Sequence, residues 1–158
     1  QIPSVADFSF PELKEYRKVL SKEDMGEIRR AIGLNAQGIG VGSYVYLRRI
    51  LERVIEKAKS MAIEDGKVIP EGYERMKVVD RIKVLKDYLP DVFVNNPSIY
   101  GIVSKGIHEL SEDDCKKYFP VLKECIFLIL EKWEKDRNKR AAEKRLAAAL
   151  SDISSKVK

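Results

Sequence analysis

The sequence predicts an all-α protein: an up-and-down helical bundle of four to five main helices with an extended C-terminal helix. Apolar side chains recur three and four residues apart through most of the chain, which is the pattern of helices with one buried face. Helix-start signals precede these segments. Strand signals do not occur, because Val68-Ile69 and Val92-Phe93-Val94 are too short to indicate a sheet.

Length and composition favour one folded domain with an appendage. The 158 residues can form a substantial core, and 44% hydrophobic with 35% charged residues is too apolar for a disordered chain. We therefore divide the chain into a lead-in with a short helix (1–20), a helical bundle (21–133) and a basic, amphipathic C-terminal helix (134–158).

The first half of the chain contains two helix starts. Ser9 and Pro11 indicate a short helix that runs to about Leu20. Residues 21–24 (Ser-Lys-Glu-Asp) resemble a capping box and predict a second helix. From there to about Ala62 the spacing is helical, and the predicted buried positions include Tyr44, Leu47, Leu51, Val54 and Ala58.

Four glycines between residues 33 and 42 interrupt this pattern. Each glycine inside a helix costs about 1 kcal/mol relative to alanine, so a break is expected near residues 35–38. A dinucleotide-binding fingerprint does not fit, because no strand precedes the glycines and Ser43 occupies the third glycine position. Small residues at helical spacing instead predict a smooth strip for close helix packing, either internal or a dimer contact: Gly33, Ala36, Gly40 and Ser43.

Three further helices are expected in the second half. Pro70 is predicted as the first residue of one that ends at Leu89, and residues 96–108 form the next. Ser111, followed by three acidic residues, is the clearest helix start in the chain. Pro120 is expected to kink or divide the helix that follows.

The C-terminal helix changes its apolar side. Residues 131–158 contain nine Lys or Arg against five Asp or Glu, so most of the net charge of +5 lies there. A core stripe ends at Trp133, and a new stripe follows on roughly the opposite side, at Ala142, Leu146, Leu150, Ile153 and Val157. We expect the helix to leave the bundle after Trp133 and to cover another surface, most simply a partner subunit or an upstream segment that precedes Gln1.

Several kinds of site are not expected. Cys115 and Cys125 are too far apart on one helix for a disulfide, and with one histidine they give no zinc-binding spacing. We therefore predict buried thiols and no metal or other cofactor. The longest aliphatic and aromatic run near the C-terminal half, residues 126–130, is far below the roughly 20 residues of a membrane-spanning helix. A cytoplasmic location without membrane association is expected.

His108 is the only histidine. With the neighbouring carboxylate of Glu109, an imidazole can act as a general acid or base near neutral pH. His108 also falls on the apolar side of its predicted helix, near the C-terminal end, where a hydrogen-bond donor is favoured for structural reasons. Both interpretations remain open.

Two stretches, "GSYVYLRRILERVIEKA" and "IYGIVSKGIHE", followed by a long acid-capped helix, resemble the HEPN superfamily of bacterial helical domains over about residues 22–133. The resemblance implies a bundle of four to five helices that usually dimerises, and in many members a metal-independent ribonuclease of toxin and antiviral defence systems. His108 matches the histidine of the family's nuclease motif, and Arg48 and Glu52 match polar positions of its second helix. The motif's arginine is missing: residues 101–103 are Gly-Ile-Val, and Lys105 is the only nearby base.

Arg48 and Glu52 have two open interpretations. They are four residues apart on a predicted helix and can form a surface ion pair. Leu47 and Leu51 flank them on the buried side, so Glu52 can alternatively turn inward and pair with His108.

Three functions follow from these observations. The first is a non-catalytic, HEPN-like homodimerisation module of a larger bacterial or defence-associated protein, with interface candidates at Gly40, Ser43, Leu146, Leu150 and Ile153. The second is a metal-independent ribonuclease that uses His108, with Lys105 or Arg48 in place of the missing arginine and with Glu52 as a further candidate catalytic residue. The third is a nucleic-acid-binding domain whose phosphate contacts come from Arg137, Lys139, Arg140, Lys144 and Arg145. A solvated helix face explains the same charges.

Overall fold

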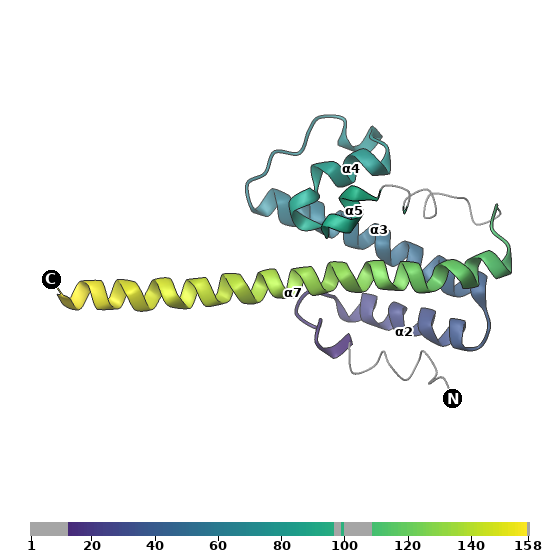
Figure 1. Ribbon diagram of the computed structural model, residues 1–158, viewed down its shortest axis with the longest axis horizontal. Helices are drawn as coiled ribbons and strands as arrows, with labels where there is room; N and C mark the ends of the chain where they lie inside the picture. Colours follow the sequence, from purple (N-terminus) through teal and green to yellow (C-terminus); the bar gives the residue numbers. More distant parts are fainter. Residues whose placement is uncertain (1–12, 97–98, 100–108, 158) are drawn as a thin grey trace.

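The computed structural model describes residues 13–96, 99 and 109–157, and it confirms the all-α class. Within these residues the chain forms α-helices and 3-10 helices and no strand (Figure 1). In chain order the elements are α2 (Lys22–Ala36), α3 (Gly40–Glu64), η1 (Tyr73–Arg75), α4 (Val78–Val84), η2 (Lys86–Tyr88), α5 (Asp91–Asn95) and α7 (Glu112–Val157).

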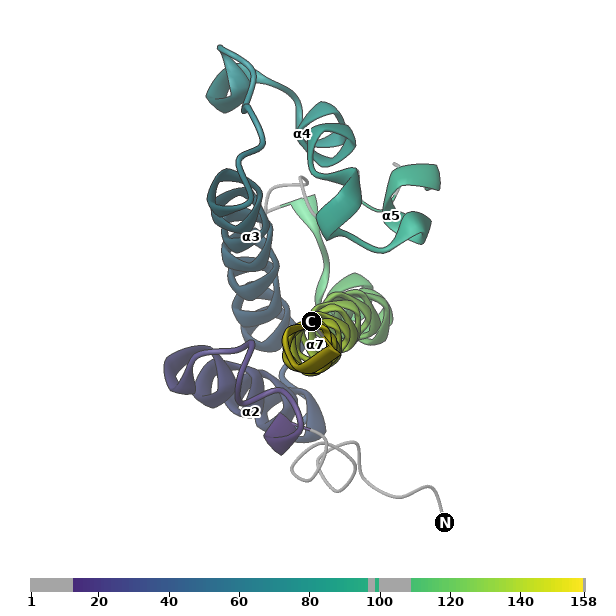
Figure 2. The same cartoon turned by 90° about the vertical axis from the view of Figure 1, so that its left-hand side faces the viewer.

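Helix α3 is the centre of the bundle, because it packs against both α2 and α7. A short turn makes α2 and α3 antiparallel. Helices α3 and α7 run in the same direction, since Gly40 contacts Glu112 at one end and Asp65 contacts Arg140 at the other. Figure 2 shows α2 on one side of this pair and the short helices α4 and α5 on the other.

The start of α2 and the break after it agree with the sequence prediction. The Ser21 hydroxyl accepts a hydrogen bond of 3.1 Å from the Asp24 amide, as a helix cap does. Helix α2 ends at Ala36, and Gly38 adopts a left-handed conformation with φ of 82°, which favours glycine. Because the helix ends here, the predicted strip of small residues is not one surface. A Cβ atom on Gly33 would meet nothing within 4 Å.

Gly40 and Ser43, in the first turn of α3, are buried within the bundle. The Glu112 carboxylate, at the start of α7, accepts hydrogen bonds from the amides of Gly40 and Val41 and so caps α3 from another helix. A Cβ atom on Gly40 would lie 2.8 Å from the Glu112 carbonyl oxygen. Ser43 is fully buried and donates a hydrogen bond of 2.9 Å to the Gly40 carbonyl. Gly40 and Ser43 were predicted either to pack internally or to form a dimer contact, and the structure shows internal packing.

Two other predictions need correction. The helix expected up to Leu20 gives way to turns after Lys14. Pro70 does not begin a helix, because Gly72 adopts a left-handed conformation and α4 starts only at Val78. Helix α5 was not predicted. The helix expected over residues 96–108 lies almost entirely outside the described residues.

Helix α7 is one continuous helix of 46 residues. The Ser111 hydroxyl accepts a hydrogen bond of 3.1 Å from the Asp114 amide, so the predicted cap is confirmed. Pro120 does not divide the helix. It lies on the exposed side, while Phe119 and Leu122 hold the opposite side of the helix in the core.

The core contains the positions expected from helical spacing. Tyr44, Leu47, Leu51, Val54 and Ala58 of α3 are buried against the stripe of α7 that ends at Trp133. Cys115 and Cys125 are both buried and free, as predicted. Burial raises the pKa of both thiols, that of Cys125 to about 11, so each is a weak nucleophile at neutral pH.

Candidate functional site

The C-terminal part of α7 projects beyond the bundle (Figure 1). Trp133 is its last buried residue, and residues 142–157 are exposed. Departure from the bundle was expected directly after Trp133. The helix instead keeps contact for two more turns, because Arg140 forms an ion pair with Asp65 at the end of α3.

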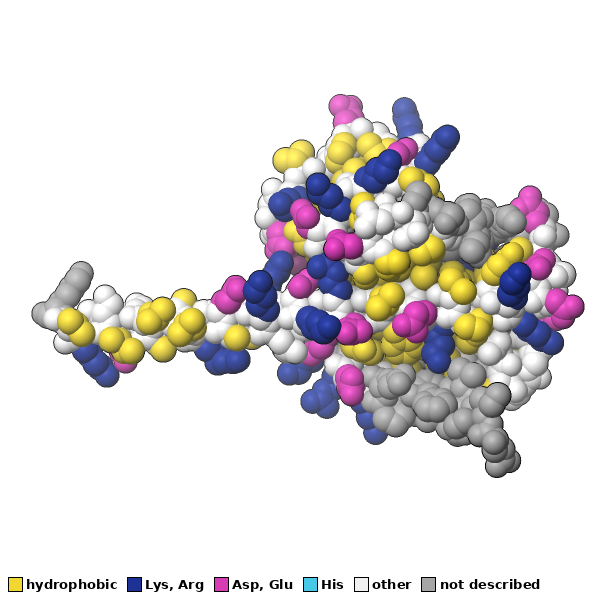
Figure 3. Space-filling model, viewed as in Figure 1, with side chains coloured by type: hydrophobic (Ala, Val, Ile, Leu, Met, Phe, Trp, Pro, Cys, Tyr) yellow, Lys and Arg dark blue, Asp and Glu magenta, His cyan; other side chains and the backbone are white. Residues whose placement is uncertain are grey.

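Four large aliphatic residues form an exposed stripe on the projecting helix, which we call the α7 seam: Leu146, Leu150, Ile153 and Val157 are exposed by 60, 57, 59 and 81%. Successive members are four, three and four residues apart, the spacing of core positions in a coiled-coil heptad. Figure 3 shows hydrophobic side chains along this part of the helix. The seam therefore has the pattern of a helix that packs against another helix.

The five basic residues predicted to bind nucleic acid do not share one face. Arg140 forms ion pairs with Asp65, with nitrogen–oxygen distances of 2.8 and 3.4 Å, and Arg137 lies 3.9 Å from Glu134. The other three, Lys139, Lys144 and Arg145, form no ion pair with a described residue. At about 100° per residue they point in three different directions around α7. Nucleic-acid binding through these residues stays a prediction.

Arg48 and Glu52 form the surface ion pair of the first interpretation. The Arg48 Nε atom lies 3.4 Å from the Glu52 carboxylate, and the Glu52 side chain is 59% exposed. Glu52 is thus not turned into the core. His108 and Lys105 lie outside the described residues, so their predicted catalytic role stays a prediction.

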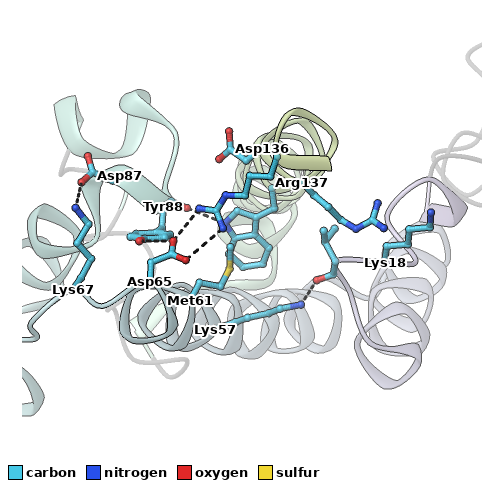
Figure 4. Close-up of a pocket in the computed structure, with 12 residues that line it drawn as sticks. Lys18, Lys57, Met61, Asp65, Lys67, Asp87, Tyr88, Asp136 and Arg137 are labelled. Atoms are coloured by element: carbon cyan, nitrogen blue, oxygen red, sulfur yellow. Dashed lines mark hydrogen bonds and ion pairs between the residues drawn. The ribbon is translucent and has the colours of Figure 1, made fainter. Parts of the chain in front are cut away.

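The structure also forms a groove that the sequence analysis did not predict. It has a volume of about 580 Å³ and lies where the end of α3, η2, the middle of α7 and the turn before α2 meet (Figure 4). Trp133 and Val19 are its buried apolar lining residues, and Met61 of α3 also lines it.

A chain of hydrogen bonds forms one wall of the groove. The Trp133 indole donates to the Tyr88 carbonyl at 2.9 Å, and the Tyr88 hydroxyl donates to Asp65 at 2.8 Å. Burial, with the Asp65 hydrogen bond, raises the pKa of Tyr88 to about 12. The hydrogen bond from Arg140 lowers the pKa of Asp65, and Tyr88 adds to this effect. The charge of the Asp65 carboxylate in this wall is therefore balanced by Arg140, and its hydrogen bonds are made within the protein.

Cationic side chains occupy the other end of the groove. The Lys57 amine donates to the Val19 carbonyl and lies 5.4 Å from the centre of the Trp133 ring. Burial of part of this side chain lowers the pKa of Lys57. In Figure 4, Arg137 of α7 extends toward Lys18, in the turn before α2, on the side of the groove to which the Lys57 side chain points. Three separate segments thus contribute positive charge to this end of the groove.

The described residues form neither a cluster of metal ligands nor a helix that could span a membrane. No group of three or more His, Cys, Asp or Glu side chains among these residues is placed to hold a metal ion. None of the helices in the same part of the chain is both long and apolar enough to cross a membrane.

Comparisons with protein-family models, with curated proteins and with solved structures give no match. The resemblance to HEPN domains is therefore not tested by these comparisons. The candidate sites of this chain are the α7 seam and the groove beside Trp133.

Proposed function

We propose that this protein is a helical interaction module that forms a homodimer through the α7 seam. The observation that carries the proposal is the exposure of four aliphatic side chains at heptad spacing, on a helix that extends beyond its own bundle. Monomeric proteins rarely expose a contiguous apolar patch of this kind, and such patches mark interaction sites.

A second copy of the same chain suits the seam for two reasons. A two-fold dimer brings identical surfaces together, and a row of Leu, Ile and Val side chains is complementary to itself. Most positions beside the seam are small and uncharged, so two helices can approach closely there: Ala142, Ala147, Ala149 and Ser154. The charged flanking residue, Lys156, forms an ion pair of 3.2 Å with Asp152 of its own helix.

The seam is short, which sets the expected strength of the dimer. It spans about two heptads, fewer than the three to four that a stable coiled coil usually has. We therefore expect a dimer that dissociates on dilution. Self-association is also what the HEPN resemblance implies, whereas RNA cleavage by His108 is a separate prediction.

Sedimentation velocity over a range of protein concentrations tests this proposal. The wild-type protein is expected to shift from the 18.1 kDa monomer toward twice that mass as its concentration rises. Leu150→Glu places a charge in the seam and should keep the protein monomeric. Ala148→Glu adds the same charge on the opposite face of α7 and should leave the association unchanged. Equal association of the two variants would contradict the proposal.

A further inference from the structure

We propose that the groove beside Trp133 binds a small organic phosphate, with the phosphate group held by Lys18, Lys57 and Arg137. The site is independent of the α7 seam, because it lies within the bundle and uses no seam residue. Its volume of about 580 Å³ falls within the range of about 300–1,000 Å³ that is usual for small-ligand sites.

The carboxylates of the groove do not neutralise these three cations. Asp65 pairs with Arg140 at 2.8 Å, and Asp87 lies 3.9 Å from Lys67. Asp136 pairs at 3.0 Å with Lys132, which does not line the groove. Asp65 and Asp136 therefore already have close cationic partners, and Asp87 has a weaker contact with Lys67.

None of the three cations has an ion pair shorter than 3.9 Å with a described residue, although the carboxylates of Asp24 and Glu64 act on Lys57 from farther away. Lys57 donates to a neutral backbone carbonyl, and Arg137 is 3.9 Å from its nearest carboxylate, that of Glu134. Lys18 forms no ion pair with any residue in the described part of the chain. An anion that enters this end of the groove would meet positive charge that no close ion pair neutralises.

A phosphate monoester fits this arrangement better than a carboxylate does. It carries close to two negative charges and three terminal oxygens, so it can accept from three donors at once. Arg137 provides a planar guanidinium that suits bidentate contact with phosphate, and the two lysines act as point charges. Partial burial of Lys57 strengthens its attraction for an anion, since less water screens it.

The organic part of the ligand would occupy the middle of the groove. Val19, Met61 and Trp133 provide apolar contacts there. The Asp65–Arg140 pair forms the opposite end, where polar groups such as hydroxyls can be accommodated. A nucleoside monophosphate has a suitable size and this distribution of chemistry.

Isothermal titration calorimetry with adenosine monophosphate, adenosine and inorganic phosphate tests the site on the 158-residue chain. Adenosine monophosphate is expected to bind saturably, and adenosine at least about tenfold more weakly, because it lacks the charge-assisted contacts. The fluorescence of Trp133, the only tryptophan, is a second readout of occupancy.

Variants separate this groove from general attraction to a basic protein. Lys18→Gln with Arg137→Gln should weaken binding of adenosine monophosphate by about tenfold or more. Lys139→Gln removes an exposed charge from the same helix outside the groove and should have no effect. The proposal is overturned if adenosine monophosphate does not bind, if adenosine binds equally well, or if the double variant binds like wild type.

Discussion

At the scale of single residues, Asp65 connects three parts of the molecule. Its carboxylate accepts hydrogen bonds from Tyr88 of η2 and from Arg140 of α7, and it directly follows the last residue of α3. The Tyr88 carbonyl in turn accepts from Trp133. This short series of contacts holds the end of α3 to α7 at the point where α7 leaves the bundle.

Asp65→Asn is therefore expected to lower the melting temperature at neutral pH, because the amide cannot form an ion pair with Arg140. The folded-state pKa of Asp65 is lowered, so its contribution is present above the ordinary pKa of about 3.9 and is lost as the pH falls through the lower folded-state value. Thermal melts of both proteins should differ at pH 7 and converge in strong acid.

Asp87→Asn is the matched control, since the Asp87 carboxylate has only an exposed, 3.9 Å contact with Lys67. Its melting temperature should stay close to that of the wild type. If the two variants were equally stable at pH 7, the Asp65 network would not be what holds α7 to α3.

The same residues show why the groove was not predictable from the sequence. Asp65 and Arg140 are 75 positions apart, and Trp133 and Tyr88 are 45 apart. Neither pair has a local spacing that indicates contact. The α7 seam was predictable, because all of its residues lie on one helix and follow one period. Arg48 and Glu52 also form the ion pair that their spacing of four residues along α3 predicted.

At the scale of helices, the close approach of α3 and α7 depends on Gly40. The first turn of α3 has no side-chain cap of its own, and the Glu112 carboxylate of α7 accepts from its amides. This cap requires the two backbones to lie close together, and only a residue without a Cβ atom fits between them.

Gly40→Ala and Gly33→Ala should change stability in opposite directions. At Gly40 the new methyl group would lie 2.8 Å from a backbone oxygen, and overpacking of this kind costs about 1–3 kcal/mol. At Gly33, inside α2, it would meet no atom within 4 Å, and the helix gains about 1 kcal/mol. Urea unfolding measures both values. Equal effects of the two substitutions would contradict the close approach at Gly40.

Local signals predicted some helix ends well and others poorly. The helix starts predicted at Ser21 and Ser111 are confirmed, because a cap depends only on the serine and the next three residues. Pro70 was misleading, since proline suits both the first turn of a helix and an irregular turn, and the left-handed Gly72 selects the second. The α4–α5 region consists of short helices held by packing, for which local periodicity is weak evidence.

At the scale of the whole molecule, the chain combines a packed bundle with a projecting helix that has no core of its own. Within the described residues, Arg140 forms the last ion pair between α7 and the bundle, and the seam begins at Leu146. The bundle should therefore fold without the seam, while self-association should require it. The phosphate site proposed within the bundle should be independent of the oligomeric state.

We propose that the α7 seam holds two copies together, and the solution mass of a chain that ends at Ala141 tests this proposal. This truncation keeps the Asp65–Arg140 ion pair and removes the seam. Sedimentation equilibrium should show concentration-dependent dimers for the full chain and only monomers for the truncated one, with Trp133 fluorescence unchanged. The same oligomer in both proteins, or a full chain that stays at 18.1 kDa at every concentration, would contradict the claim.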